Sequence, residues 1–549
     1  MCARGELPSV PGKRRALIVL SKSGLRNAVA CALLQSVAFA CGNAAGADLT
    51  FNISLIAESN PFPPNNSAFS YADVWSESGY AYVGSDRGYT VSTAGNGAQG
   101  ISIFSISNSG VPTFLPPLTS APPLPVDAPA DSFYAPTTYR GSEMEDVEVH
   151  DGIGYFSSDV NGTGGRTGVD IVDLSIPFEP ILLSRVDTFD CLSGSPSVCG
   201  HGKVHTLSVQ RFNPNTPSET RFLYTSDNTS TVVKITNVTD PEAPQLIRSL
   251  SLTGVGANVD SHEVVVRNNR LYVASKNPSS SSTEAYFHIF DVSTPANPVL
   301  LKAFPSGDKT HTAMPTDDGK TLIVAEERAN GNVKIYDISN INSPNDPDTP
   351  VLKATLNAAN VCHLGTCISA HSPHHVHTHG NLMFLPWYEA GLQVFNISNP
   401  ASPVLVGSYD TSPGNADNYS GNWGVDLSMG LKRILVSDRQ RGLMVLDASA
   451  VVIPGDYNQD MVVNAADYDV WRASFGTTRS GVHDAPYADG NYDGVVDAAD
   501  YVVWRNNLGQ TQSGFAVGLG LAAVPEPASV VLLLIGVGVM STRRRNRAA

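Results

Sequence analysis

Hydrophobic and polar positions alternate along the middle of the chain in a unit that recurs. Each copy places apolar residues at about every second position, as in FHIFDVS, and a Pro-x-x-Pro turn with another apolar run often follows. Alternation with a period of two predicts β-strands that bury one face more than the other. The copies begin at residues 101, 169, 232, 287, 333, 392 and 443.

Two further short strand candidates precede each copy, for example HEVVV and LYVAS before FHIFDVS. Each unit of about fifty to sixty residues thus contains four strands, the content of a β-propeller blade. The seventh copy lacks its last strand, and FNISLIAES at 51–59 could supply it and pair the exposed edges of the ring. We predict a mainly β fold with a seven-bladed β-propeller over residues 48–452. Eight blades or an open array are the alternatives.

The segments VDIVDLSIPFEP, FHIFDVSTPANP and LQVFNISNPASP resemble LVIVD repeats. These repeats occur in exported bacterial propellers of mostly unassigned activity. The resemblance implies the fold, but a fold does not by itself determine chemistry.

Two segments after the propeller, DYNQDMVVNAAD (456–467) and DGNYDGVVDAAD (489–500), each precede a short amphipathic helix candidate. Both fit a twelve-position loop whose oxygens at positions 1, 3, 5, 7, 9 and 12 surround Ca²⁺. The predicted ligands in the first loop are Asp456, Asn458, Asp460, the Val462 carbonyl, Asn464 and Asp467. Those in the second loop are Asp489, Asn491, Asp493, the Val495 carbonyl, Asp497 and Asp500.

The duplicated loop and helix resemble a type I dockerin. The resemblance implies that residues 453–512 form a small α-helical domain that binds two Ca²⁺ ions and docks to a cohesin-like protein partner. A calcium-stabilised spacer without a partner is the alternative. Position six of the loop favours Gly because of its sharp turn, and it is Gly494 in the second loop but Met461 in the first. We therefore expect the first site to be weaker, or its turn to be strained.

Histidines occur at equivalent positions when the blades are aligned. Four consecutive blades begin their first strand near His205, His262, His311 and His374 or His375, and the other three begin near Asp73, Asp146 and Asp426. First strands line the channel of a propeller, so these side chains should converge at one mouth. Imidazole suits copper, iron or zinc, and we predict a candidate transition-metal site at His205, His262, His311 and His374. The alternative is a polar channel that holds only water.

Four cysteines downstream of residue 47 form two close pairs, Cys191 with Cys199 and Cys362 with Cys367. In an exported protein two local disulfides are expected. The alternatives are free thiols, or thiolates that bind metal together with His201, His363 or His371.

Both ends of the chain carry targeting patterns. Basic residues, an apolar run and a small-x-small triplet at residues 45–47 predict a signal peptide over 1–47, removed by signal peptidase. Residues 524–549, after a linker at 513–523, contain Pro-Glu-Pro, an apolar run and an arginine cluster, and resemble the PEP-CTERM sorting signal. That resemblance implies exosortase processing at the bacterial cell surface. The apolar run is short for a membrane span of about twenty residues, and a plain tail anchor is the alternative.

The net charge of −16 argues against a nucleic-acid partner, because phosphate binding needs a basic surface. The chain contains no GxSxG, Walker, HExxH or CxxC motif, so the sequence does not decide whether the protein is an enzyme. Three functions remain. The first is a surface binding or scaffold module, the second a metal-dependent, oxidoreductase-like enzyme, and the third an accessory protein in polysaccharide catabolism.

Overall fold

The computed structural model describes residues 50–516, all within the compact unit Asp48–Ala549, apart from a set of internal segments. These segments are 62–69, 88, 92–95, 99, 115–132, 135–143, 160–167, 188–202, 253–258, 277–283, 345–347, 359–361, 364–365, 368–370, 413–418, 479–487 and 513–514. The predicted signal peptide, the sorting segment, Cys191, Cys199 and His201 lie outside the described residues. No helix among the described residues is long and apolar enough to cross a membrane.

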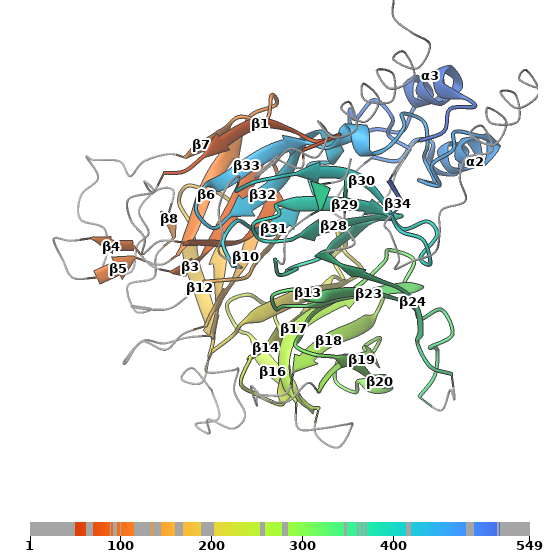
Figure 1. The fold of residues 1–549 in the computed structure, drawn as a ribbon. Coiled ribbons are helices and arrows are strands. Elements are labelled where there is room, and N and C mark those ends of the chain that lie inside the picture. Colours follow the sequence, from red (N-terminus) through yellow and green to blue (C-terminus); the bar gives the residue numbers. More distant parts are fainter. Residues whose placement is uncertain are drawn as a thin grey trace, which may run out of the picture. The chain divides into compact units, whose positions relative to one another are not determined.

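Seven antiparallel sheets, each with four consecutive strands or their equivalent, form the blades (Figure 1). Blade 1 contains β2 (Ser70–Glu77), β3 (Tyr80–Arg87), β6 (Ile101–Ile106) and β7 (Pro112–Phe114). Blade 2 contains β9 (Val147–His150), β10 (Ile153–Ser158), β11 (Gly168–Asp173) and β12 (Ile181–Val186). Blade 3 contains β13 (Thr206–Phe212), β14 (Thr220–Ser226), β15 (Val232–Asn237) and β16 (Gln245–Ser251).

The remaining blades follow the same order. Blade 4 contains β17 (Asp260–Arg267), β18 (Arg270–Lys276), β19 (Ala285–Asp291) and β20 (Val299–Gly307). Blade 5 contains β21 (Thr310–Pro315), β22 (Thr321–Glu326), β23 (Asn332–Asp337) and β24 (Val351–Asn357). Blade 6 contains β27 (His377–His379), β28 (Leu382–Pro386), β29 (Leu392–Asn396) and β30 (Val404–Tyr409). Blade 7 contains β31 (Asn422–Asp426), β32 (Ile434–Asp438), β33 (Gly442–Asp447) and β1 (Ser54–Ser59).

Smaller elements lie in the connections. Two short strand pairs, β4 (Tyr89–Val91) with β5 (Asn96–Ala98) and β25 (Cys362–His363) with β26 (Thr366–Cys367), lie outside the blades, and β8 (Phe133–Tyr134) pairs with β6. Two 3-10 turns, η4 (Leu431–Arg433) and η5 (Ser449–Val451), flank β32 and β33.

The N-terminal strand closes the ring, as the sequence predicts. β1 pairs antiparallel with β33, from Ser54 opposite Asp447 to Ser59 opposite Leu443. The first and last parts of the propeller therefore share one sheet, visible as the adjacent orange and blue arrows of Figure 1. The count of seven blades is confirmed, and the alternatives of eight blades or an open array are excluded.

Apolar layers between neighbouring blades form the core. Tyr82 and Ile103 of blade 1, for example, pack with Val147 and Phe156 of blade 2. Similar clusters join the other blades, including the layer between blades 6 and 7 around Leu446. Because each blade buries both faces, its central strands are nearly continuous runs of hydrophobic residues.

Two helices follow the predicted calcium loops, α2 (Ala465–Ser474) and α3 (Ala498–Asn507). Each begins with a capping box, in which Asn464 or Asp497 caps the first turn. The Trp471 indole donates to the Asp497 carbonyl at 2.8 Å, and the Trp504 indole donates to the Asn464 carbonyl at 2.7 Å. Each helix thus forms a hydrogen bond to the loop of the other copy, and this reciprocal arrangement follows from the duplicated sequence.

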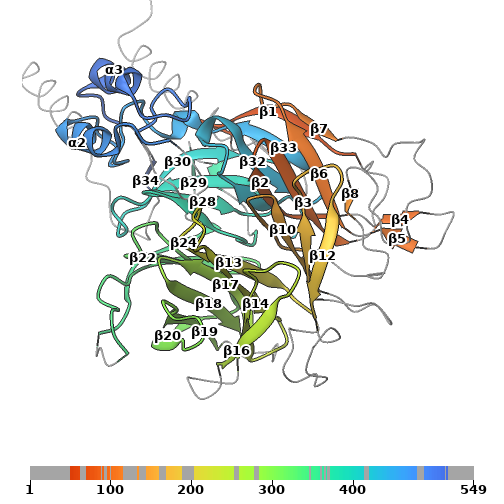
Figure 2. The same cartoon turned by 180° about the vertical axis from the view of Figure 1, so that it is seen from behind.

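The loop and helix pair packs against the propeller. The Asn381 side chain donates to the Asn458 carbonyl at 2.8 Å, and the Asn396 side chain donates to the Gln459 carbonyl, also at 2.8 Å. Downstream of α3, β34 (Phe515–Ala516) adds to the outer edge of β30, next to which it lies in both views (Figures 1 and 2). Part of the stretch predicted as a linker is therefore a strand of blade 6.

Met461 occupies a left-handed backbone conformation, with a φ of 74°, and its equivalent Gly494 has a φ of 91°. This conformation is unfavourable for a side chain. We predict that Met461→Gly relieves about 1 kcal/mol or more of backbone strain and tightens calcium binding at the first loop. The reciprocal Gly494→Met, whose new Cβ would meet nothing within 4 Å, should weaken the second loop through backbone strain alone. Calorimetric calcium titration of both variants checks the pair, and unchanged affinities would contradict the prediction.

Candidate metal centre

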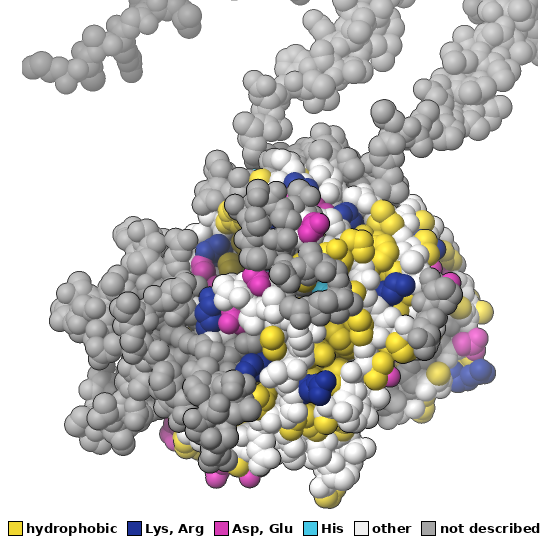
Figure 3. Space-filling model, turned by 90° about the horizontal axis from the view of Figure 1, so that it is seen from below, with side chains coloured by type: hydrophobic (Ala, Val, Ile, Leu, Met, Phe, Trp, Pro, Cys, Tyr) yellow, Lys and Arg dark blue, Asp and Glu magenta, His cyan; other side chains and the backbone are white. Residues whose placement is uncertain are grey.

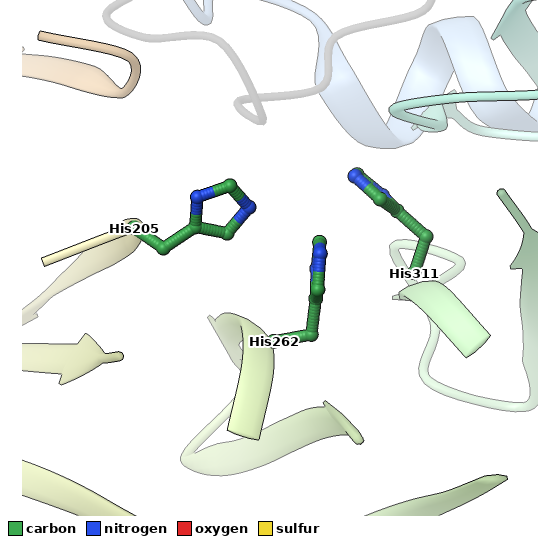
Figure 4. A group of neighbouring side chains, drawn as sticks. All are labelled: His205, His262 and His311. Carbon is green, nitrogen blue, oxygen red and sulfur yellow. The ribbon is translucent and has the colours of Figure 1, made fainter. Parts of the chain in front are cut away.

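Four histidines from four consecutive blades lie side by side at one mouth of the channel. His205 directly precedes β13, His262 lies in β17, His311 lies in β21, and His374 precedes β27. The ring centroids are 4.5 Å apart for His205 and His262, 4.3 Å for His262 and His311, and 4.4 Å for His311 and His374. Figure 4 shows the first three rings projecting from separate strands toward one space. The structure thus brings together all four predicted residues.

Potential ligand atoms in this arc lie close enough to share one ion. One atom from each of His205, His262 and His311 lies within 4.8 Å of the others, and the same is true of His311, Glu327 and His374. A cavity of about 20 Å³ lies among His205, His311, His374 and the layer beneath them. That space is enough for about one water molecule or one ion.

Hydrogen bonds orient the imidazole rings. Nδ1 of His205 lies 2.7 Å from Glu145 and 3.1 Å from Asp159, and Nδ1 of His374 donates to the Trp423 carbonyl at 2.8 Å. Nδ1 of His311 lies 3.1 Å from the Thr312 hydroxyl. These contacts do not involve the Nε2 atoms, of which that of His311 lies 3.8 Å from Glu327. Carboxylate or carbonyl partners on the second nitrogen are the usual arrangement around metal-binding histidines.

His262 is the central member of the arc, and only 2% of its surface is exposed. Its Nδ1 atom is buried without a hydrogen-bond partner among the described residues. Burial, Lys276 and the neighbouring imidazoles lower the pKa of His262 well below its usual value. A buried, neutral and unsatisfied imidazole is the form that binds a metal ion, so the residues present fit such a group.

Two carboxylates give the arc its negative charge. Burial alone would lower the pKa of His205, but Glu145 and Asp159 outweigh it and raise this pKa to about 10. The two carboxylates therefore require a positive neighbour, which either an imidazolium or a metal ion satisfies.

A second polar layer lies beneath the arc. His375 lies 3.4 Å from Glu263 and 3.7 Å from Asp73, and burial of its ring is outweighed by these carboxylates, which raise its pKa well above the usual value. Asp146, another predicted channel residue, accepts from the Leu207 amide at 2.7 Å. The segment HSPHHVHTHG therefore contributes His374 to the arc and His375 to this layer.

Asp426 does not lie where the sequence alignment placed it. It is the last residue of β31 rather than its first, and its Oδ1 accepts from the Ser76 hydroxyl at 2.5 Å. Trp423 lies beside the arc instead, with its ring 4.3 Å from that of His374. The first strand of blade 7 therefore begins at Asn422, earlier in the sequence than the alignment placed it.

Several residues of the site were not predicted from the sequence. Asp159 and Glu327 directly follow the second strands of blades 2 and 5, and antiparallel pairing returns those ends to the mouth where the first strands begin. The pattern of an acidic residue after the second strand, as in FSSD and VAEE, could have indicated them. The Tyr388 hydroxyl donates to Glu327 at 2.7 Å, and nothing in the sequence distinguishes this tyrosine.

The predicted cysteine pair Cys362 and Cys367 lies on opposite strands of the β25–β26 ladder, where the two residues face each other in the backbone register. This placement is compatible with a local disulfide, which stays a prediction. His371 lies 2.8 Å from Glu389, away from the arc.

Three cavities share lining residues along the channel. Asp73, Asp146, Glu263 and His375 line both the 20 Å³ cavity and one of about 110 Å³. Trp75 and His150 in turn line both the 110 Å³ cavity and a third of about 1030 Å³. The third cavity lies at the ends of the first strands, and so at the mouth opposite the histidines.

Comparisons with known families support the fold and the export. The profile of the LVIVD repeat matches residues 375–411, that of the Choice-of-anchor I domain matches residues 215–351, and that of the PEP-CTERM protein-sorting motif matches residues 523–547. The last match confirms the predicted sorting signal. It indicates bacterial export to the cell envelope or surface and processing by exosortase-type machinery.

The chain matches no curated protein. Among solved structures it is similar to U3-55K, with 8% identity, a TM-score of 0.43, and coverage of 72% of this chain and 98% of that one. It is also similar to a protein from Lactobacillus plantarum, with 11% identity, a TM-score of 0.41, and coverage of 67% and 87%. Raptor from Chaetomium thermophilum shows 10% identity, a TM-score of 0.43, and coverage of 79% and 32%. These values are too low to carry an argument about function.

Proposed function

We propose that this exported propeller is a surface metalloprotein that holds one transition-metal ion at the channel mouth. The observation that carries the proposal is the convergence of His205, His262 and His311 from three blades, with their potential ligand atoms within 4.8 Å of one another. His374 and Glu327 extend the donor set. Imidazole and carboxylate donors together suit copper, iron or zinc.

A metal-dependent, oxidoreductase-like enzyme is the second candidate, because of the cavity beside the arc. Three histidine ligands leave coordination positions open, as catalytic sites do and structural sites do not. The 20 Å³ space admits only a very small molecule such as water or dioxygen. In such an enzyme the residues around the arc would orient the imidazole rings. Glu145 and Asp159 hold the ring of His205, and the Trp423 carbonyl holds that of His374.

Elemental analysis of the purified exported chain, prepared without chelators, tests the transition-metal proposal. We expect about one equivalent of copper, iron or zinc per chain. Reduction and reoxidation of the bound metal, followed by its visible or paramagnetic signal, would then separate the enzyme from a binding module. A chain without a stoichiometric transition metal would refute both candidates.

We further propose that the loop and helix pair binds two Ca²⁺ ions and serves for protein docking to a cohesin-like partner. The equivalent contacts of the two loops support this proposal. Asp456 and Asp489, at the first position of each loop, each accept from two amides of their own loop. Asp467 and Asp500, the last residues of the two loops, each accept from backbone amides of their own loop, and both are fully buried.

Asp500→Ala should abolish calcium binding at the second loop and destabilise α3. Asp500 accepts from the amides of Gly490, Asn491 and Asp497, which the variant would leave without their acceptor. An amide left without its acceptor costs about 1 to 3 kcal/mol when it is buried, and these amides are partly exposed, so each contributes at the lower end of that range. Calorimetry should show two calcium ions bound by the parent chain and one by the variant. Asp469→Ala, at an exposed site on α2, is the control and should bind two.

A further inference from the structure

A cavity of about 1030 Å³ lies at the mouth opposite the histidines, and neither the metal centre nor the docking role uses it. Its walls come from the ends of the first strands of blades 1, 2, 3 and 7, including Glu77, His150, Arg211 and Ser428. Its volume is at the upper end of the range for small-molecule sites, which is about 300–1,000 Å³. The space therefore suits several units of a chain molecule better than a single ion.

The second calcium loop forms one side of this cavity. Asp489, Tyr492, Asp493 and Gly494 line it, whereas no residue of the first loop is among its described lining residues. Blade 7 fixes the loop in place, because Lys432 donates to the Asn491 carbonyl at 3.1 Å and its ammonium lies 4.8 Å from the centre of the Tyr492 ring. An ion held by Asp489 and Asp493 would therefore be part of the cavity wall.

The remaining wall combines aromatic and polar groups. Trp75 and His150 meet edge to face with centroids 5.2 Å apart, and the Trp75 indole is already bound to the Val149 carbonyl at 2.9 Å. Tyr80 also lines the cavity. The Trp75 indole nitrogen and His150 Nε2 thus have protein partners, and the aromatic rings contribute apolar surface to the wall.

The charged side chains of the wall differ in how far protein partners already occupy them. The Glu77 carboxylate accepts from the amides of Asp151 and Gly152, and the Asp151 carboxylate accepts from Arg211 and Arg221. Arg433 instead makes one long contact, 3.4 Å to the Asn108 carbonyl. Arg433 and a calcium ion in the second loop are thus the cations best placed to meet a ligand.

We propose that this cavity is a calcium-dependent binding cleft for a polysaccharide chain, in which the ion of the second loop takes oxygen ligands from the sugar. Ca²⁺ accepts six to eight oxygens, so beyond the six positions of the loop about two hydroxyl or carboxylate oxygens of a sugar can join the shell. Sugar rings stack their apolar faces on aromatic rings such as Trp75 and Tyr80, and Arg433 hydrogen-bonds their hydroxyls or carboxylates. A peptide would instead need a free sheet edge or deep apolar pockets. The inference rests on the proposed calcium binding of the second loop.

Two matched variants test the cleft. Asp493→Asn and Asp460→Asn replace the fifth position of the two loops, and the parent side chains make the same local contacts, to the amide two residues later and to an Asn side chain. Only Asp493 lines the cavity. Binding of the full exported chain is measured on an array of immobilised neutral and uronate-containing polysaccharides, with calcium and with EGTA.

We expect calcium-dependent binding of the parent chain to at least one polysaccharide, reduced about tenfold or more by Asp493→Asn and unchanged by Asp460→Asn. Arg433→Ala should weaken binding while both calcium ions remain. A chain that binds two calcium ions by calorimetry but no polysaccharide, or that binds a peptide array instead, would overturn the cleft and leave the calcium proposal intact. A chain that binds no calcium would overturn both.

Discussion

Replacing His262 with alanine should remove the transition metal from the protein. His262 lies between His205 and His311, with ring centroids 4.5 and 4.3 Å away, so its loss divides the arc. The variant removes the group of His205, His262 and His311 but leaves His311, Glu327 and His374 within 4.8 Å of one another, so loss of the metal would place the ion in the first group. We expect the metal content to fall from about one equivalent to background in elemental analysis.

His150→Ala is the control for this experiment. His150 lies at the end of β9, at the opposite mouth of the channel, and pairs with Glu148 at 2.9 Å. This variant should keep its metal. Because His262 is buried, His262→Gln serves as a second variant that preserves more side-chain volume, and its circular dichroism should match that of the parent. Metal retained by both His262 variants would contradict the proposed centre.

The blades were predictable because their pattern is local and repeated. A copy such as FHIFDVS carries the alternation of a strand and the turn after it, and seven repetitions exclude chance. The closure by β1 was also predictable, since an incomplete last blade and an unassigned first strand leave one way to pair both edges.

The site was predictable only in part, because the blade alignment locates the residues that start the first strands but not the residues of other strands that contact them. His205, His262 and His311 were found since each begins a strand of ordinary length. Asp426 was misplaced because β31 begins at Asn422, before the segment that the blade alignment used as the start of this strand. Asp159 and Glu327 reach the arc through the pairing of strands within a blade, and Glu145 of blade 2 contacts His205 of blade 3. These are tertiary contacts that the apolar pattern does not encode.

The two mouths of the channel differ in their chemistry. Imidazoles and buried carboxylates surround a cavity of about 20 Å³ at the first mouth, whereas aromatic rings and the second predicted calcium loop border a cavity of about 1030 Å³ at the other. Polar side chains lie along the channel between the two mouths, because Asp73, Glu263 and His375 line both the cavity at the arc and the cavity below it. A propeller can present different side chains at its two mouths because the first strand of each blade begins near one mouth and ends near the other.

A chain that begins at Asn60, and so lacks β1, should be far less stable than one that begins at Asp48. Five residue pairs join β1 to β33, and Ile53 is buried in the layer between blades 6 and 7. Burial of one Ile contributes about 2 kcal/mol, and each ladder hydrogen bond contributes about 1 kcal/mol. The loss is thus about 5 kcal/mol or more, against a total stability of about 5–15 kcal/mol for a folded domain.

This truncation also breaks the bridge between blades 6 and 7. Phe51 exchanges two backbone hydrogen bonds with Ser408 of blade 6, at 2.9 and 3.0 Å, while β1 itself belongs to blade 7. Removing both contacts exposes the edge of β33, which is a template for aggregation. Urea unfolding followed by tryptophan fluorescence should show a lower midpoint and a broader transition. Leu55→Ala, at a β1 side chain that is 38% exposed, should shift the free energy of unfolding by only about 0.5 kcal/mol. Equal stability of the truncated and parent chains would mean that the ring closes without β1.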